Sequence, residues 1–146
     1  MKASASNVRI QFGIDHVDWE AVCEIIRLAP LGTRNPDKLR SAATNSYAVC
    51  TAYEGGNLIG FGRAISDGYY QSAIYDVVVH PECQGRGVGK ALMEALLDKL
   101  PRSGPVLIYA APGKQDFYRQ FGFEVLKTGM ARFPDPERYR AKGYLA

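Results

Sequence analysis

Three glycines at alternate positions lie between an apolar run and an amphipathic stretch. They are Gly85, Gly87 and Gly89, within residues 76–90. The pattern predicts a buried strand, a turn, a glycine-rich loop and a helix that runs to about Leu100. Backbone N–H groups that no side chain covers, at a helix start where the dipole favours negative charge, form a phosphate site. A simple tight turn needs one glycine of positive φ rather than three, so this alternative is disfavoured.

Two nucleotide-binding motifs fit this loop poorly. A dinucleotide fingerprint needs G-x-G-x-x-G in an open parallel sheet and an acid after the next strand. Here the strands before the loop are expected to be antiparallel, and no acid follows residues 106–110 at the right place. A Walker loop needs Gly-Lys-Ser/Thr, whereas Lys90 precedes Ala91, which has no hydroxyl group for magnesium. Both nucleotide interpretations are therefore weak.

The elements before the loop predict two helices and an antiparallel meander. Trp19, Val22 and Ile26 recur at helical spacing, and Asp15 is the expected N-cap of their helix. Asn35 followed by Pro36 predicts the start of a second helix, which ends near residue 44. Strands are expected at residues 8–12, 47–53, 58–66 and 70–79.

The elements after the loop complete a mixed sheet. A strand over 106–110 should lie parallel to the strand ending at Val79, because a helix connects them. A short helix over 115–121 should end at Gly122, followed by a strand over 123–127 that 130–133 prolongs. The fold class is therefore α/β (α+β type), with a mixed, mostly antiparallel central sheet flanked by helices.

Composition limits the classes of function. The 146 residues are 47% hydrophobic and 23% charged, which predicts a single domain over residues 1–146. The net charge is +3 and the basic residues are scattered, which argues against a nucleic-acid partner. No apolar run approaches the roughly 20 residues of a membrane span, and residues 1–6 lack the apolar segment of a signal peptide. Three widely spaced cysteines argue against disulfides and a zinc site, and indicate a reducing, cytoplasmic location.

Two motifs carry a resemblance to a known family. The pattern Gln84-x-x-Gly87-x-Gly89 resembles the acyl-CoA pyrophosphate loop of the GNAT (Gcn5-related) N-acetyltransferases. Residues 117–123, Phe-Tyr-Arg-Gln-Phe-Gly-Phe, resemble the family's F-Y-x-x-x-G-F segment. The two motifs occur in the family's order, with the expected strand between them. Element order agrees over roughly the whole chain, while specific motifs are confined to about residues 70–123.

The resemblance implies acetyl-CoA as co-substrate and no metal. Strands 74–79 and 106–110 would splay apart, and the pantetheine arm would pair with the edge of the first strand. The pyrophosphate would lie on the glycine loop, with Arg86 and Lys90 adding charge. The implied acetyl-CoA-binding residues are Val77, Val78, Val79, Gln84, Gly85, Arg86, Gly87, Val88, Gly89, Lys90 and Tyr118.

The implied chemistry is direct attack of an amine on the thioester. The backbone N–H near Val77 would polarise the carbonyl group. Tyr118 would protonate the departing thiolate, because a phenol with a pKa of about 10 is protonated at neutral pH; core packing is the alternative for this ring. Asp76 is the candidate that orients the amine or passes its proton to water, and a structural hydrogen bond to a neighbouring loop is an equal alternative. No covalent intermediate is needed, so Cys83 is not expected to be a nucleophile.

The acceptor is the open question. Trp19, Tyr70 and Tyr75 are candidate substrate contacts that would suit a small, aromatic primary amine, although core and sheet-face packing also explains such residues. Residues 65–68 and 75–79 are similar to plastid and cyanobacterial GNAT enzymes that act on arylalkylamines such as serotonin. A protein lysine or N-terminal acetyltransferase and a non-catalytic acyl-CoA sensor stay as alternatives. Aromatic residues near the C-terminus suggest a partner surface and a homodimer, namely Phe133, Tyr139 and Tyr144.

Overall fold

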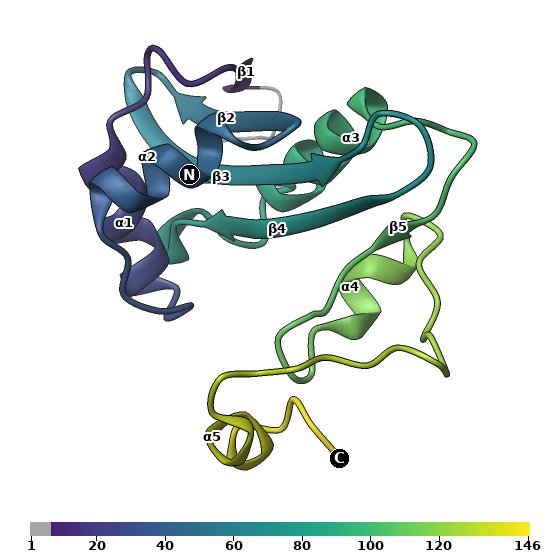
Figure 1. Ribbon diagram of the computed structural model, residues 1–146. Helices are drawn as coiled ribbons and strands as arrows, with labels where there is room; N and C mark the ends of the chain where they lie inside the picture. The colour runs from purple at the N-terminus through teal and green to yellow at the C-terminus, as the bar shows by residue number, and fades with distance from the viewer. Residues whose placement is uncertain (1–6) are drawn as a thin grey trace. The chain divides into compact units, whose positions relative to one another are not determined.

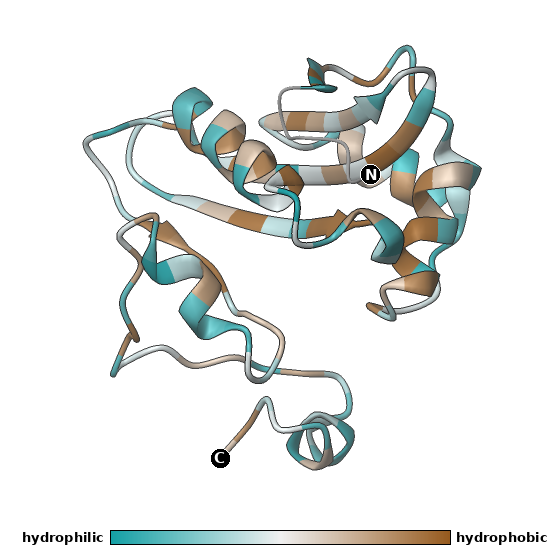
Figure 2. Ribbon diagram, turned by 180° about the vertical axis from the view of Figure 1, so that it is seen from behind, coloured by the Kyte–Doolittle hydropathy of each residue, from teal (hydrophilic) through white to brown (hydrophobic). Residues whose placement is uncertain are grey.

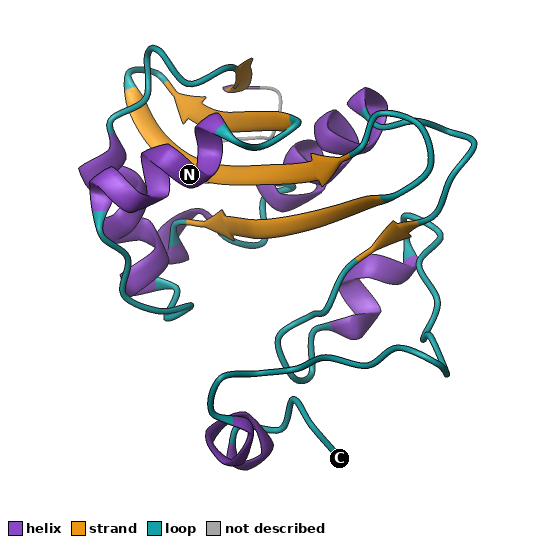
Figure 3. Cartoon of the chain, viewed as in Figure 1, coloured by secondary structure: helices purple, strands orange, loops and turns teal. Residues whose placement is uncertain are grey.

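The computed structural model describes residues 7–146, which form two compact units, one ending at Ile108 and one running from Tyr109 to Ala146. The first unit contains a five-stranded sheet in the order β1-β2-β3-β4-β5 (Figures 1 and 3). Its first four strands are antiparallel neighbours, and β4 and β5 are parallel, so the predicted mixed sheet is confirmed. The strands are β1 Val8–Phe12, β2 Ala48–Glu54, β3 Asn57–Ser66, β4 Ser72–Val79 and β5 Val106–Leu107.

Helices cover both faces of this sheet. Helices α1 (Trp19–Leu28) and α2 (Pro36–Thr44) share a core with Phe61 of β3. Helix α3 (Val88–Lys99) lies on the opposite face, beneath Gly60 and Gly62 of the same strand. Figure 2 shows hydrophobic residues, in brown, along the central strands and on the helices beside them. Fully buried side chains fill both layers: Val22, Ile26 and Phe61 on one side, and Leu92, Met93 and Leu96 on the other.

Two glycines let α3 approach β3 closely. A Cβ atom on Gly60 would lie 2.9 Å from Leu92 Cδ1, and one on Gly62 would lie 3.0 Å from Leu96 Cδ1. Both contacts are tighter than ordinary packing, so a larger residue at either position would require Leu92 or Leu96 to move. This close approach holds the start of α3, and thus the glycine loop, against the end of β4.

Side-chain caps mark the starts of α1 and α2. Asp18, rather than the predicted Asp15, is the N-cap of α1, because its Oδ1 accepts a hydrogen bond from the Ala21 N–H at 3.1 Å. The start of α2 is as predicted: the side chain of Asn35 accepts from the Lys38 N–H at 3.0 Å. A 3-10 turn, η2 (Pro81–Cys83), leads from β4 into the glycine loop.

The second unit contains the helices α4 (Gln115–Arg119) and α5 (Pro136–Ala141). Gly122 ends the first helical segment with φ +87°, and its N–H donates to the Arg119 carbonyl at 3.0 Å, as predicted. The predicted strands over 123–127 and 130–133 are wrong. Within residues 7–146 no strand pairs with this segment, and Met130 is 98% exposed, so alternating apolar residues alone did not make a strand.

The C-terminal aromatic residues pack on one another. The rings of Phe133 and Tyr139 stack with centroids 4.0 Å apart, and Tyr144 lies edge-on to Tyr139 at 5.6 Å. The three side chains are half-buried rather than exposed. Their apolar character is therefore explained within the unit, and a homodimer stays a prediction. No helix among the described residues is long and apolar enough to cross a membrane.

Candidate functional site

The glycine loop presents bare backbone at the start of a long helix. Gly85 and Gly87 have φ values of +78° and +83°, a conformation that favours glycine. Gly87 is the N-cap of the twelve-residue helix α3, and no side chain caps the N–H groups of its first turn. A Cβ atom on Gly85 would meet nothing within 4 Å. Val88 and Gly89 follow within that turn, and because the Val88 side chain is buried only its backbone can face a ligand.

The polar side chains of the loop are directed to the protein. Gln84 Nε2 donates to the Val79 carbonyl at 3.2 Å and so fixes the loop to the end of β4. Arg86 forms an ion pair with Glu54 at the end of β2, and only 12% of the Arg86 side chain is exposed. Its Nε is buried and has no hydrogen-bond partner among the described residues. Arg86 therefore anchors the loop, and the exposed cation is Lys90, with its Nζ 3.9 Å from Glu94.

Strand β4 leaves part of its outer edge unpaired by β5. The parallel pairing joins only Ser72 to Val106 and Ala73 to Leu107. Residues 74–79 continue without β5 at their side, as Figure 1 shows. An extended ligand can add to such an edge through backbone hydrogen bonds. Val78 lies in the core at 3% exposure, while Val77 and Val79 are half-buried, so their backbone rather than their side chains would serve this purpose.

A β-bulge interrupts β4 at Asp76. Arg63 pairs with Tyr75 and Phe61 with Val78, so two residues of β4 face the single residue between them on β3. Asp76 has φ +58° and is the only non-glycine residue of positive φ within 7–146. A bulge bends the strand and redirects its backbone groups. This bend occurs where the resemblance implies that the thioester carbonyl would lie.

The Asp76 carboxylate is held by two arginines. Arg34 Nη2 donates to Oδ1 at 2.8 Å, and Arg63 Nε donates to Oδ2 at 2.7 Å. The side chain of Asp76 is only 11% exposed. Burial raises the pKa of Asp76, but the hydrogen bonds from Arg34 and Arg63 outweigh it and leave the pKa below its usual value. A carboxylate held in this way is a poor proton acceptor at neutral pH, which favours the structural alternative for this residue.

Tyr118 lies in α4 and is half-buried. The rings of Phe117 and Phe123 surround it, with centroids 5.0 Å and 6.1 Å away. Burial raises the pKa of the Tyr118 phenol above its usual value. The group is therefore protonated at neutral pH, as a proton donor requires. Cys83 is buried, and burial also raises the pKa of its thiol, which disfavours a nucleophile there.

The three residues predicted to contact the acceptor do not lie together in the structure. Trp19 lies in the core with its ring edge-on to Phe61 at 5.9 Å, so it has no free face for a substrate. Tyr70 is 76% exposed in the turn before β4, at the end of the strand away from the glycine loop. Tyr75 is half-buried beside the guanidinium group of Arg63, 5.7 Å from its ring. Only Tyr75 is next to the bulge.

Sequence reasoning missed the two arginines. Arg34 and Arg63 are single residues among 18 basic side chains, and no motif marks them. Arg34 belongs to the segment between α1 and α2, and Arg63 to β3, so only the fold brings them to Asp76. The one available signal was an acid inside an apolar run, which indicates that a partner must exist but does not identify it.

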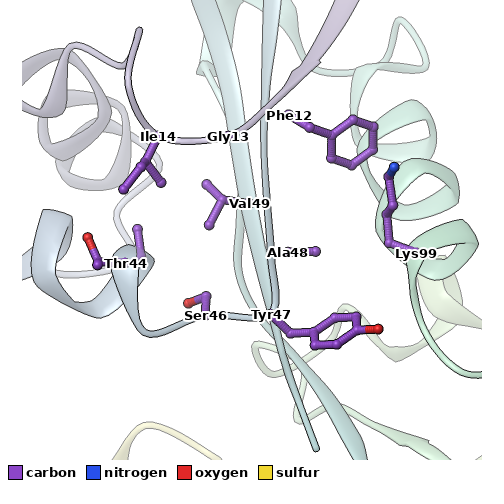
Figure 4. Close-up of a pocket in the computed structure, with 10 residues that line it drawn as sticks. Phe12, Gly13, Ile14, Thr44, Ser46, Tyr47, Ala48, Val49 and Lys99 are labelled. Atoms are coloured by element: carbon purple, nitrogen blue, oxygen red, sulfur yellow. The ribbon is translucent and has the colours of Figure 1, made fainter. Parts of the chain in front are cut away.

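A pocket of about 520 Å³ lies away from the glycine loop, although Ser46, which accepts a hydrogen bond from Arg63, is part of its lining. It is at the end of β1 and the start of β2, whereas Glu54 and the glycine loop are at the other end of β2. In Figure 4 the side chain of Lys99 points toward the ring of Phe12, and its Nζ is 4.6 Å from the ring centroid. None of the predicted site residues lines this pocket. No cluster of His, Cys, Asp and Glu within residues 7–146 could hold a metal ion.

The parallel pair that separates after two residues, the bulge and the uncapped glycine loop together define an acetyltransferase fold of the GNAT type. The family model described as an acetyltransferase (GNAT) domain matches residues 45–125. The chain belongs to this family. A GNAT-family acetyltransferase from Streptococcus pneumoniae superposes with a TM-score of 0.74 at 26% identity, over 86% of this chain and 97% of that one.

Two curated plant relatives show the range of acceptors among similar proteins. Serotonin N-acetyltransferase 2 of Oryza sativa, a chloroplastic protein, is 34% identical over 73% of this chain and 56% of its own length. Histone acetyltransferase TAP1 of Glycine max is 34% identical over 80% of this chain and 55% of its own length. The chain thus spans about half the length of these relatives. Their names point to one small amine and one protein acceptor.

Proposed function

We propose that the chain is an acetyl-CoA-dependent N-acetyltransferase that acts on a primary amine, and that this amine is small and aromatic. The observation that carries the proposal is the loop itself. Gly85 and Gly87 adopt positive φ values that favour glycine at the uncapped start of α3, and they follow a strand edge that β5 leaves unpaired. One continuous segment can thus bind phosphate at its loop and pair with an extended ligand along its strand edge. This arrangement suits a long ligand with phosphates at one end.

The proposed reaction needs few side chains. The pyrophosphate would bind the N–H groups from Gly85 to Gly89, and the pantetheine arm would pair with residues 74–79. The N–H near Val77 would polarise the thioester carbonyl while the neutral amine attacks. A C–N bond forms, the C–S bond breaks, and the thiolate takes the proton of the Tyr118 hydroxyl group. The proton of the amine leaves to water, and water restores that of Tyr118.

A protein lysine or N-terminus is the second candidate acceptor. It is favoured by the similarity to the Glycine max histone acetyltransferase, as the small amine is favoured by the similarity to the serotonin enzyme. The presence of both Tyr118 and the glycine loop favours an enzyme over a non-catalytic acyl-CoA sensor. We also propose a cytoplasmic location, since Cys23, Cys50 and Cys83 are all free thiols.

One experiment separates these functions. Acetyl-CoA is incubated with serotonin, tryptamine, an aliphatic diamine and a lysine-containing histone peptide, and products are identified by mass spectrometry. Acetylated serotonin or tryptamine, with turnover lost in Tyr118→Phe, is the expected result. Acetylated peptide alone would favour the protein acceptor, and CoA binding without any product would favour the sensor. If calorimetry finds no affinity for CoA, the central proposal is wrong.

A further inference from the structure

Asp76 adopts a disfavoured backbone conformation, which contacts of its side chain must stabilise. A non-glycine residue at φ +58° is disfavoured, although Asp and Asn tolerate it better than other types. Here the residue forms the bulge of β4, between Tyr75 and Val77. Backbone conformations of this kind persist where the surroundings hold them, and they concentrate at functional sites. The contacts of the carboxylate therefore decide what holds the bulge.

Those contacts join four parts of the first unit. Arg34 approaches from the segment between α1 and α2 with two hydrogen bonds, at 2.8 and 3.2 Å. Arg63 of β3 donates from Nε to Asp76 at 2.7 Å and from Nη1 to Ser46 Oγ at 3.3 Å. The Ser46 hydroxyl group in turn donates to the Ala42 carbonyl in α2 at 2.8 Å. The bulge is thus tied to β3, to the segment between α1 and α2 and, through Ser46, to the last turn of α2.

We propose that Asp76 is a positioning residue: its carboxylate, held between Arg34 and Arg63, keeps the β4 bulge in the shape that presents the strand's backbone to the thioester. The inference rests on the proposed function and deepens it. The arginines use both carboxylate oxygens, so the group orients the strand rather than accepting the amine's proton. The lowered pKa of Asp76 agrees with this role. Each arginine is then needed as much as the acid.

The test is a mutant cycle on the full chain. Asp76→Asn keeps a residue that tolerates positive φ but removes the charge, and Arg63→Met removes one partner while it leaves the carboxylate intact. Arg27→Met is the matched control, because Arg27 forms an exposed ion pair with Glu24 on α1. Two reactions are measured for each variant: acetylation of the best amine in the panel, and the slower hydrolysis of acetyl-CoA without amine. Each gives a kcat and a KM for acetyl-CoA.

We expect Asp76→Asn and Arg63→Met each to lower kcat by about 10- to 100-fold, the usual effect of slight misplacement, with the KM for acetyl-CoA nearly unchanged. The double variant should be no slower than the slower single variant, since both remove one interaction. Arg63→Lys should recover part of the rate, and Arg27→Met should match the wild type. If Asp76→Asn does not fold, Asp76→Gly, which adopts this φ without strain, should show the same loss.

Two results would overturn the inference. Full kcat in Arg63→Met together with no activity in Asp76→Asn would make the carboxylate a base. Unchanged kcat in Asp76→Asn would show that the bulge does not need the ion pair. Both results require an active wild type, so they are distinct from failure of the proposed function, in which the wild type would neither bind CoA by calorimetry nor acetylate an amine.

Discussion

Replacement of Gly87 by alanine should separate the phosphate role of the loop from its role in stability. Gly87 and Gly68 share a φ of +83°, and Gly68 lies in the turn between β3 and β4, at the end of β4 away from the loop. An alanine in this conformation costs about 1–2 kcal/mol at either position. Both variants should therefore lose about 2–8 °C in melting temperature. Gly68→Ala is a matched control because its Cβ would make only an ordinary 3.4 Å contact with Tyr47.

Only Gly87→Ala should weaken binding of CoA. Gly87 is exposed at the uncapped start of α3, so its Cβ would stand beside the N–H groups that the phosphate must reach. Loss of one hydrogen bond to a charged group costs about 1.5–3 kcal/mol. That corresponds to a dissociation constant about 10- to 100-fold higher. Isothermal titration with CoA at 25 °C measures it, and a differential scan of the same samples gives the melting temperature.

The comparison can refute the assignment in two ways. Equal loss of CoA affinity in both variants would attribute the effect to general destabilisation. Unchanged affinity in Gly87→Ala, with the expected fall in melting temperature, would place the phosphate elsewhere. A phosphate site at Gly87 requires that the two variants lose similar stability and differ in their affinity for CoA.

Three further changes test the surroundings of the loop. Gly60→Ala should destabilise the fold by about 1–3 kcal/mol in urea unfolding, because its Cβ would lie 2.9 Å from Leu92 Cδ1. Glu54→Gln should weaken CoA binding in titration, because it releases the Arg86 side chain that anchors the loop. Tyr118→Phe should lower kcat and leave the acetyl-CoA KM unchanged. In the wild type, burial raises the pKa of Tyr118, so the fall in kcat caused by loss of this proton should come only above pH 10.

The first two of these changes each have a control within the chain. Gly56→Ala should be nearly neutral, since its Cβ would meet nothing within 4 Å. Glu24→Gln breaks an exposed ion pair on α1 and should leave CoA binding unchanged. A kcat of Tyr118→Phe equal to that of the wild type would remove the phenol from the mechanism. A stable Gly60→Ala would show that the Leu92 side chain or α3 can move to make room for the methyl group.

The sequence predicted those parts of the fold that depend on local pattern. The meander, the parallel pairing and the caps at Asn35 and Gly122 follow from spacing, turn residues and connection length. The N-cap of α1 was misplaced because Asp15 and Asp18 are chemically equivalent choices three residues apart. The strand predicted over 123–127 failed because a strand exists only where a neighbour accepts its hydrogen bonds, and pairing is not a local property.

In the candidate site too, features of the local backbone could be predicted from the sequence, whereas long-range contacts could not. Glycine is the residue type that positive φ favours, so the loop conformation at Gly85 and Gly87 could be predicted from the sequence. The roles of charged side chains could not, because a partner distant in sequence decides where each one points. Arg86 was expected on the phosphate and is paired with Glu54, and Asp76 was a candidate base and is held by Arg34. In both cases the fold supplied an opposite charge that no motif records.

These two ion pairs change how the electrostatics of the site should be understood. With Arg86 neutralised by Glu54, the fixed positive potential at the loop comes mainly from the N–H groups of α3, whose partial charges cannot move away from the ligand. Lys90 is exposed and adds a mobile charge that salt screens readily. CoA affinity should therefore depend only weakly on ionic strength, and Lys90→Met should reduce it far less than Gly87→Ala. Backbone geometry, which Gly60, Gly62 and the Arg86–Glu54 pair hold in place, is then the property of the loop that binding requires.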